Sequence, residues 1–416
     1  MSETLRTAPD TGRHGTAIPS TTPPSPATAT TSAVPSVADR PRLITRPLAL
    51  VFVCSLGTMI AFYLLLSVVP LYAASAGSGG IGAGLSTGAL MLSTVAAELA
   101  CPRLLARFGH RRVLAAGVVL LGLPALALPA SAGMATVLTV SLVRGVGFAI
   151  VVVVTGVLVA TLVPAERRGE GLGVSGVVIG VPAVLALPLG VWLAGRFGYT
   201  PIFIAGAVSA LAVLVAIPGL PDRPPSPAGE PAAAGKPLGV LDGLRSAALL
   251  RPSVVFASTA MAAGVVVTFL PSAVAGGGAA AGLLVQAAAG TLTRWWAGRF
   301  GDRHGAGRLL APGVLAAAAG VAALSVASGP VAVMAAMALF GAGFGVAQNA
   351  SLSLMYDRVP LSGYGTVSAV WNLAYDGGMG LGGAGFGLAA AQTGYPAAFA
   401  LTGALVLLVL PLARRS

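Results

Sequence analysis

Charged residues are scarce in this chain. Only 9% of its 416 residues are Asp, Glu, Lys or Arg, and 56% are hydrophobic, whereas soluble domains carry about 25% charged residues. These charges are too few to cover a water-facing surface. A surface in contact with lipid needs none, so the composition predicts a membrane protein.

Cysteine and histidine are also rare, which excludes several classes of protein. Cys54 and Cys101 fall in apolar runs and cannot form a disulfide framework. The three histidines, His14, His110 and His304, lie outside the apolar blocks. Those blocks contain no paired-carboxylate motif and no nucleophile–histidine arrangement of the kind that an embedded enzyme would need. We therefore expect neither an enzyme nor a cofactor.

What the chain has in abundance is long uncharged sequence. Six blocks of 42 to 55 residues each contain at most one charge. A membrane-spanning helix needs about 20 apolar residues, and each block is divided by a breaker rich in Gly, Pro, Ser or Thr. Each block therefore predicts two helices joined by a hairpin, and the six predict twelve. The blocks are 47–97, 113–165, 171–221, 252–293, 309–356 and 359–413.

The arginines between the blocks predict the orientation. The net charge is +12, and nearly every Arg lies in a cluster between blocks or in the N-terminal segment. An even number of spans separates successive clusters, so all of them face one side, while Arg196 alone lies in an opposite hairpin. An excess of Arg marks the cytoplasmic side. We therefore expect a multi-pass protein of the cell membrane with both termini in the cytoplasm, and the charge does not indicate a nucleic-acid partner.

Two segments are not predicted to span the membrane. Residues 1–46 are rich in Ser, Thr, Pro and Ala and indicate a disordered cytoplasmic tail. Residues 222–251 indicate a cytoplasmic linker that ends in a short interfacial helix. The two membrane domains are then an N-terminal bundle, 47–221, and a C-terminal bundle, 252–416.

The two bundles repeat one another with an offset of 196 residues. Four motifs recur in the same register, and the pairs are Gly109 with Gly305, Gly145 with Gly341, Pro164 with Pro360, and Gly198 with Gly394. Six helices followed by six related helices is a known plan of secondary transporters, with the substrate site at the repeat interface near the middle of the membrane.

One motif resembles a family signature. The segment GRFGDRHG, from Gly298 to Gly305, resembles the cytoplasmic-loop motif of the major facilitator superfamily, and its counterpart PRLLARFGHRR retains Arg107 and Gly109. GVGF and GAGF resemble the Gly-rich fourth and tenth helices of that family. VPAERRGEGLG resembles the loop between helices 4 and 5 of its proton-coupled exporters. The resemblance covers residues 47–415 and implies an all-α fold of two six-helix bundles around a central cavity, working by alternating access.

Four charged residues fall inside predicted spans: Glu98, Arg144, Arg294 and Asp376. A charge at the centre of a bilayer costs about 2.5–3.5 kcal/mol on insertion scales, so such residues usually face a cavity or a partner. Counting from the hairpins puts Arg144 and Asp376 near the midplane. Glu98 and Arg294 are repeat mates near the cytoplasmic ends, where they could pair. The structural alternatives are a snorkelling Arg294 and ion pairs or hydrogen bonds within the bundles.

These residues lead to three sets of candidate sites. A desolvated carboxyl group near an arginine can take up and release a proton, so Asp376, with Glu98, is predicted to couple transport to protons. Predicted substrate-binding residues are Arg144, Gln348, Asn349, Trp371, Asn372 and Tyr375. Predicted gating residues are Gly298, Asp302, Arg303, Gly305, Arg107, Gly109 and Arg294.

The leading hypothesis is a proton-coupled antiporter that exports a small amphipathic molecule, a drug or a metabolite, as in multidrug resistance. Its expected partners are the substrate, protons and the lipid bilayer, and we expect a monomer. A second hypothesis is an uptake permease for a sugar or other metabolite. A third is a receptor or scaffold on a transporter fold, because fold does not dictate function.

Overall fold

The computed structural model describes residues 44–164, 167–222, 240–274, 277–360 and 363–414. All regular secondary structure in these ranges is helical. The predicted N-terminal tail falls almost wholly outside them, as does most of the predicted linker. A short helix, α8 (Val240–Arg245), lies in the remaining part of that linker.

The first half of the chain forms six spans. The first is interrupted at Ser67, and the third and sixth end in tighter 3₁₀ turns. The elements are α1 (Arg46–Leu66), α2 (Val68–Ala73), α3 (Gly79–Phe108), α4 (His110–Gly122) with η3 (Leu123–Ala130), α5 (Met134–Leu162), α6 (Arg168–Phe197), and α7 (Thr200–Leu211) with η5 (Ala212–Gly219).

The second half forms six more. Its elements are α9 (Ala247–Ala273), α10 (Gly278–His304), α11 (Gly307–Ala323), α12 (Gly329–Tyr356), α13 (Tyr364–Leu407) and α14 (Leu410–Arg414). Helix α13 is two spans in one, because Gly394, with φ 77°, breaks its helical geometry. Glycine adopts this left-handed conformation without the steric penalty that a Cβ would bring.

Length and composition identify eight described stretches apolar enough to cross a membrane. Two of them, Arg46–Phe108 and Tyr364–Arg414, each contain two spans, since Gly77 breaks the first at φ 97° and Gly394 the second. Helix α10, which is less apolar because of its charged end, and the 17-residue α11 bring the described spans to twelve. The predicted all-α membrane fold is confirmed.

The repeat seen in the sequence is also present in the packing. A Cβ on Gly145 would meet the Leu90 carbonyl, and a Cβ on its mate Gly341 would meet the Gln286 carbonyl. Leu90 and Gln286 are themselves 196 residues apart. Gly147 and Gly343 repeat the relation against α4 and α11, next to Gly117 and Gly313 respectively. Glycine is needed at these points because the helix backbones touch.

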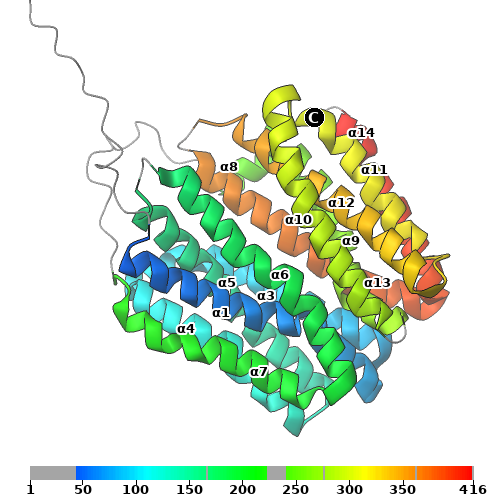
Figure 1. Cartoon of the computed structure of the whole chain (residues 1–416), viewed down its shortest axis with the longest axis horizontal. Coiled ribbons are helices and arrows are strands. Elements are labelled where there is room, and N and C mark those ends of the chain that lie inside the picture. Colours follow the sequence, from blue (N-terminus) through cyan, green and yellow to red (C-terminus); the bar gives the residue numbers. More distant parts are fainter. Residues whose placement is uncertain (1–43, 165–166, 223–239, 275–276, 361–362, 415–416) are drawn as a thin grey trace, which may run out of the picture. The chain divides into compact units, whose positions relative to one another are not determined.

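The helices of each half pack mainly on one another, and the halves meet where α3 contacts α13 and α6 contacts α10. Figure 1 shows α1 to α7 (blue to green) grouped together and α9 to α14 (yellow-green to red) grouped beside them. Contacts between the halves include a hydrogen bond between the Thr87 and Thr268 hydroxyls at 2.9 Å. A Cβ built on Gly80 would also lie 3.5 Å from the Tyr395 hydroxyl.

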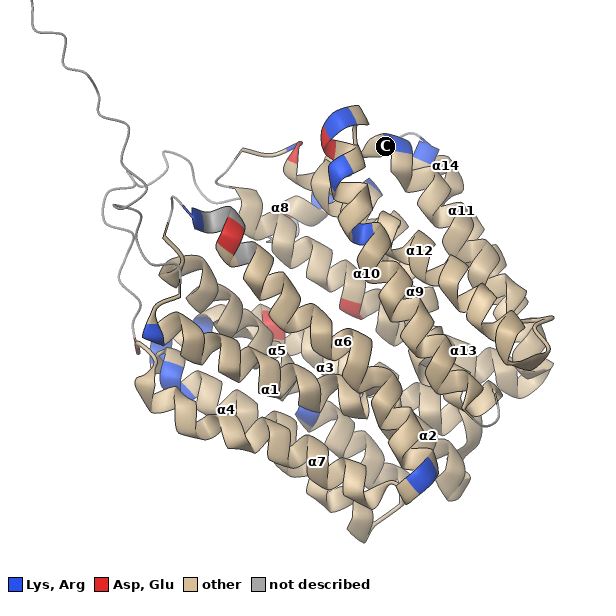
Figure 2. Cartoon of the chain, in the orientation of Figure 1, with Lys and Arg blue, Asp and Glu red and all other residues tan. Residues whose placement is uncertain are grey.

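These contacts lie toward the end of the bundle opposite the charged loops; Figure 2 shows most charges at the loop end. Two glycines of α6 have no close neighbour. Gly176 and Gly180 are the repeat mates of Asn372 and Asp376, and no atom from outside their own helix backbone lies within 4 Å of a Cβ at either position. A cavity of about 430 Å³ lies between α6 and α10 at the hairpin end, and its lining residues are Leu71, Val191, Trp192, Gly195, Arg196, Pro271, Val274, Gly277, Ala279 and Ala280.

Candidate transport site

Two carboxyl groups from opposite halves meet at the α3–α13 contact. Asp376 is 4% exposed, and its carboxyl lies within hydrogen-bonding reach of the Glu98 carboxyl. The helices come this close because small residues line the contact, where Gly380 would place a Cβ 2.9 Å from that of Met91. Two acids so close can remain together in a desolvated site by sharing a proton.

A basic residue and two phenols lie near this acid pair. The exposed side chain of Arg294, on α10, is within electrostatic reach of the hydroxyls of Tyr63 and Tyr375. Both hydroxyls also lie in the field of Asp376. Neither Arg294 nor either acid of the pair forms an ion pair within the described ranges. The predicted pairing of Glu98 with Arg294 is therefore absent from this conformation, and tyrosines stand between the acidic and basic groups.

Aromatic rings form a wall beside the acid pair. Trp371 stacks on Phe256 with ring centroids 4.5 Å apart and planes 11° apart, and it lies nearly parallel to Tyr375 at 6.1 Å and 6°. The Trp371 indole also donates a hydrogen bond of 3.2 Å to the Ser351 hydroxyl, which fixes the ring. In the first half, Phe62 stacks on Phe148 at 3.6 Å. Stacked aromatic rings thus pack in both halves, and Trp371 and Tyr375 are the partly exposed members.

The amide residues predicted to bind substrate occupy different places. Asn349 lies against α10, with its side-chain nitrogen 3.4 Å from an ideal Cβ on Gly298, and its oxygen is buried without a partner in the part of the chain that the structure describes. Gln348 and Asn372 are partly buried. Asn372 lies on a partly buried turn of α13 together with Trp371. Asn349, a predicted binding residue, thus packs against Gly298, a predicted gating residue.

The structure does not bring Arg144 to the acid pair. Its side chain is 1% exposed and donates from Nε to the Leu121 carbonyl at 3.3 Å, inside the first bundle. Thr94, one turn before Glu98, donates to the carbonyl of Gly145, the residue after Arg144, at 3.2 Å, so Arg144 lies nearer the start of α3 than Glu98 does. Arg144 is therefore not part of the group around Asp376, whereas Arg294 lies near the two phenols of that group.

The glycines that close the two loop motifs have a clear structural role. Gly109 and Gly305 have φ of 78° and 88°, and their amides donate to the carbonyls of Leu105 at 3.0 Å and Gly301 at 2.8 Å. Each ends its helix in the left-handed conformation that glycine favours. A Cβ on Gly109 would also meet the Asp222 carboxylate at 2.8 Å.

The charged residues that were predicted to act in gating lie at the loop end of the helices. Arg107 lies over the ring of its neighbour Phe108, 5.2 Å from the centroid, and Asp302 and Arg303 are exposed. Asp302 makes no hydrogen bond or ion pair to α6 within the described residues. A contact between Asp302 and the start of α6, which the pseudo-symmetry of the repeat suggests, is thus not made in this conformation.

Sequence reasoning missed Tyr63, Phe256 and the Thr87–Thr268 bond. Aromatic and hydroxyl residues are common in apolar spans, so none of these carried a signal of its own. Tyr63 and Tyr375 were distinguishable only by their distance to Asp376, which depends on how the two halves are docked.

Twelve spans in two repeated bundles, with ionisable and aromatic groups between them, define a membrane transport protein. A family model described as "Major Facilitator Superfamily" matches residues 51–383. The chain belongs to this superfamily, which makes it a transporter and not an enzyme.

Solved structures share the fold. The nucleoside transporter NupG superposes with a TM-score of 0.71 at 12% sequence identity, covering 89% of this chain and 99% of NupG. A bacterial homologue of the human lysosomal transporter Spinster, in an inward-facing and unoccupied conformation, gives 0.71 at 14% identity, covering 89% and 96%. No curated protein matches the sequence.

Proposed function

We propose that this transporter exports a small, flat, amphipathic molecule in exchange for protons, and that the Glu98–Asp376 pair carries the proton. The observation behind the proposal is the meeting of two carboxyl groups from opposite halves within hydrogen-bonding reach. A proton shared there holds α3 against α13. Its loss leaves two like charges that repel across the same contact, so the protonation state and the docking of the halves are linked.

The surroundings of the pair support a substrate with an extended ring system. The partly exposed rings of Trp371 and Tyr375, which pack on the buried Phe256, offer flat surface, and flat rings bind such surfaces by offset stacking. Arg294 and the acid pair provide charge of both signs within the same site. In export, the substrate would enter from the end with the arginine clusters, which we assign to the cytoplasm of the cell membrane.

The second candidate is an uptake permease acting through the same site. The aromatic wall would equally suit a planar metabolite, and one structural neighbour is titled a nucleoside transporter. An accumulation screen in whole cells, with and without an uncoupler, separates the two. Export predicts that the uncoupler raises accumulation, and proton-driven uptake predicts that it lowers it.

Proton coupling is tested with Asp376→Asn and Glu98→Gln in inside-out vesicles. Both replacements keep hydrogen-bonding groups and neither can titrate. We expect Asp376→Asn to fold and insert normally, to lose uphill transport driven by a proton gradient, and to keep downhill exchange. Asp357→Asn, an exposed acid outside the site, is the matched control and should be fully active. Full uphill transport by both Asp376→Asn and Glu98→Gln would refute the coupling role.

A further inference from the structure

A second polar site lies inside the first half, apart from the acid pair. Arg144 has its Nη2 buried without a hydrogen-bond partner among the described residues, and it forms no ion pair with any described acid. A charge in such surroundings is strongly destabilising unless another group compensates it. The exposed fraction of the side chain, 1%, means that bulk water does not supply the compensation.

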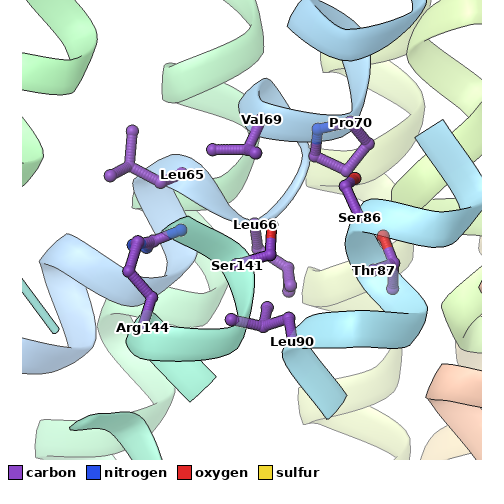
Figure 3. A pocket seen from close by; sticks show the side chains of 9 residues that line it. All are labelled: Leu65, Leu66, Val69, Pro70, Ser86, Thr87, Leu90, Ser141 and Arg144. Carbon is purple, nitrogen blue, oxygen red and sulfur yellow. The ribbon is translucent and has the colours of Figure 1, made fainter. Parts of the chain in front are cut away.

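The guanidinium borders a small cavity, shown in Figure 3 beside the interruption of the first span. The space that the centre of a water molecule can occupy there is about 10 Å³, which is room for one water molecule or one small ion. Interrupted helices of this kind mark ion sites in other transporters. The cavity is lined by Leu65, Leu66, Val69, Pro70, Ser86, Thr87, Leu90, Ser141 and Arg144.

Arg144 and Ser141 are the side chains at this cavity with donor groups that no described residue accepts from. Ser141 precedes Arg144 by one turn on the same face of α5, and its buried hydroxyl has no hydrogen bond among the described residues. The Ser86 hydroxyl already donates to the Ala83 carbonyl at 2.7 Å, and the Thr87 hydroxyl is bonded to Thr268. A cationic guanidinium and a free hydroxyl at one cavity favour an anion over a cation.

The repeat shows that packing does not require a charge at this position. The mate of Arg144 is Phe340, which is completely buried in the equivalent place in the second half. Its ring and backbone fill the contact with Gly320. The fold therefore accepts an apolar side chain here, and a buried arginine in its place calls for a bound partner.

We propose that the cavity beside Arg144 binds one small monovalent anion of the halide class, held by the Arg144 guanidinium and the Ser141 hydroxyl. The bound anion neutralises the guanidinium and ties the interrupted first span to α3 and α5. A tetrahedral oxyanion such as sulfate is too large for the space. The site is independent of the proposed proton coupling, because its residues are not those of the acid pair.

The proposal is tested on the purified full-length protein by thermal unfolding in chloride, bromide, gluconate and sulfate at equal ionic strength. We expect chloride and bromide to raise the unfolding temperature with a saturable dependence on concentration, and gluconate and sulfate to leave it unchanged. Arg144→Met should abolish the halide effect. Ser141→Ala should weaken the apparent halide affinity about five- to tenfold, the effect of one hydrogen bond.

The matched control is Arg196→Met, which removes an exposed arginine and should keep the halide effect. Equilibrium binding of radiolabelled chloride to the wild type, expected at one site per chain, decides the question even if Arg144→Met fails to fold. An unfolding temperature insensitive to the anion together with no saturable chloride binding would overturn the proposal, and a water molecule would then be the occupant. A halide effect that persists in a folded Arg144→Met would also overturn it.

Discussion

Arg294 is the basic residue near the two phenols that border the acid pair. It lies on α10, and the hydroxyls of Tyr63 and Tyr375 stand in the fields of both Arg294 and Asp376. A positive charge near two carboxyl groups favours their ionised form. Arg294→Gln should therefore let the pair keep its proton to higher pH and move the pH optimum of transport upward. The measurement is the pH profile of substrate flux in vesicles, with Arg196→Gln as the control whose profile should not move. An unchanged profile in Arg294→Gln would place Arg294 outside the electrostatic reach of the pair.

Trp371 is expected to act through its flat surface. It stacks on Phe256 and is fixed by the Ser351 hydroxyl. An aromatic pair contributes about 0.5–1.5 kcal/mol beyond its buried area, so Trp371→Leu should raise the substrate KM about 2- to 12-fold with little change in maximal rate. Trp371→Phe should retain most of the affinity. Equal KM values for the wild type and the Leu variant would remove Trp371 from the binding surface.

Counting residues from the hairpins predicted the heights of the charged residues but not their partners. Height follows from the helical rise alone, whereas a partner depends on the side of the helix and on the docking of the bundles. Arg144 points into the first bundle, towards Leu121. Glu98 meets an acid from the other half, and no local pattern in the sequence announces such a contact.

Helices α3 and α9 are joined across the two halves by Thr87 and Thr268, whose hydroxyls are 2.9 Å apart. Alternating access requires this contact to open. In a background without Cys54 and Cys101, the pair Thr87→Cys and Thr268→Cys should form a disulfide on oxidation, because the side chains already touch. Transport should fall to background when the bond forms and recover on reduction, and each single variant serves as a control. Continued transport by the cross-linked protein would show that these helices need not separate.

Helix boundaries were predicted well where glycine breaks the chain. The expected hairpins contain Gly77 and Gly394, and both have positive φ. The interruption at Ser67 was not predicted, because the apolar run continues through it. Pro70 explains it afterwards: proline has no amide hydrogen to donate to the carbonyl four residues earlier.

The orientation of the whole molecule follows from the arginine clusters, and chemical labelling tests it. Ala76 and Asp357 are exposed at opposite ends of the helices. In the cysteine-free background, a cysteine at Ala76 should react with an impermeant maleimide added outside intact cells. A cysteine at Asp357 should react only after the membrane is permeabilised. The opposite pattern would reverse the predicted topology.

The repeat was the most informative sequence feature at the scale of the whole chain. An offset of 196 residues predicted which glycines are equivalent, and Gly145 and Gly341 indeed meet equivalent carbonyls in the two bundles. The repeat did not predict the conformation, because a pseudo-symmetric sequence is compatible with either end of the protein being open.

The contact between α3 and α13 has a consequence for how such a protein can diversify. Gly84 and Gly383 meet there through main-chain atoms, which are the same whatever side chains line the cavity. Residues such as Trp371 or Asn372 can therefore change over generations without disturbing the surface on which the two halves rock. A lineage can therefore change the substrate that it transports while it keeps the contact surface between the two halves.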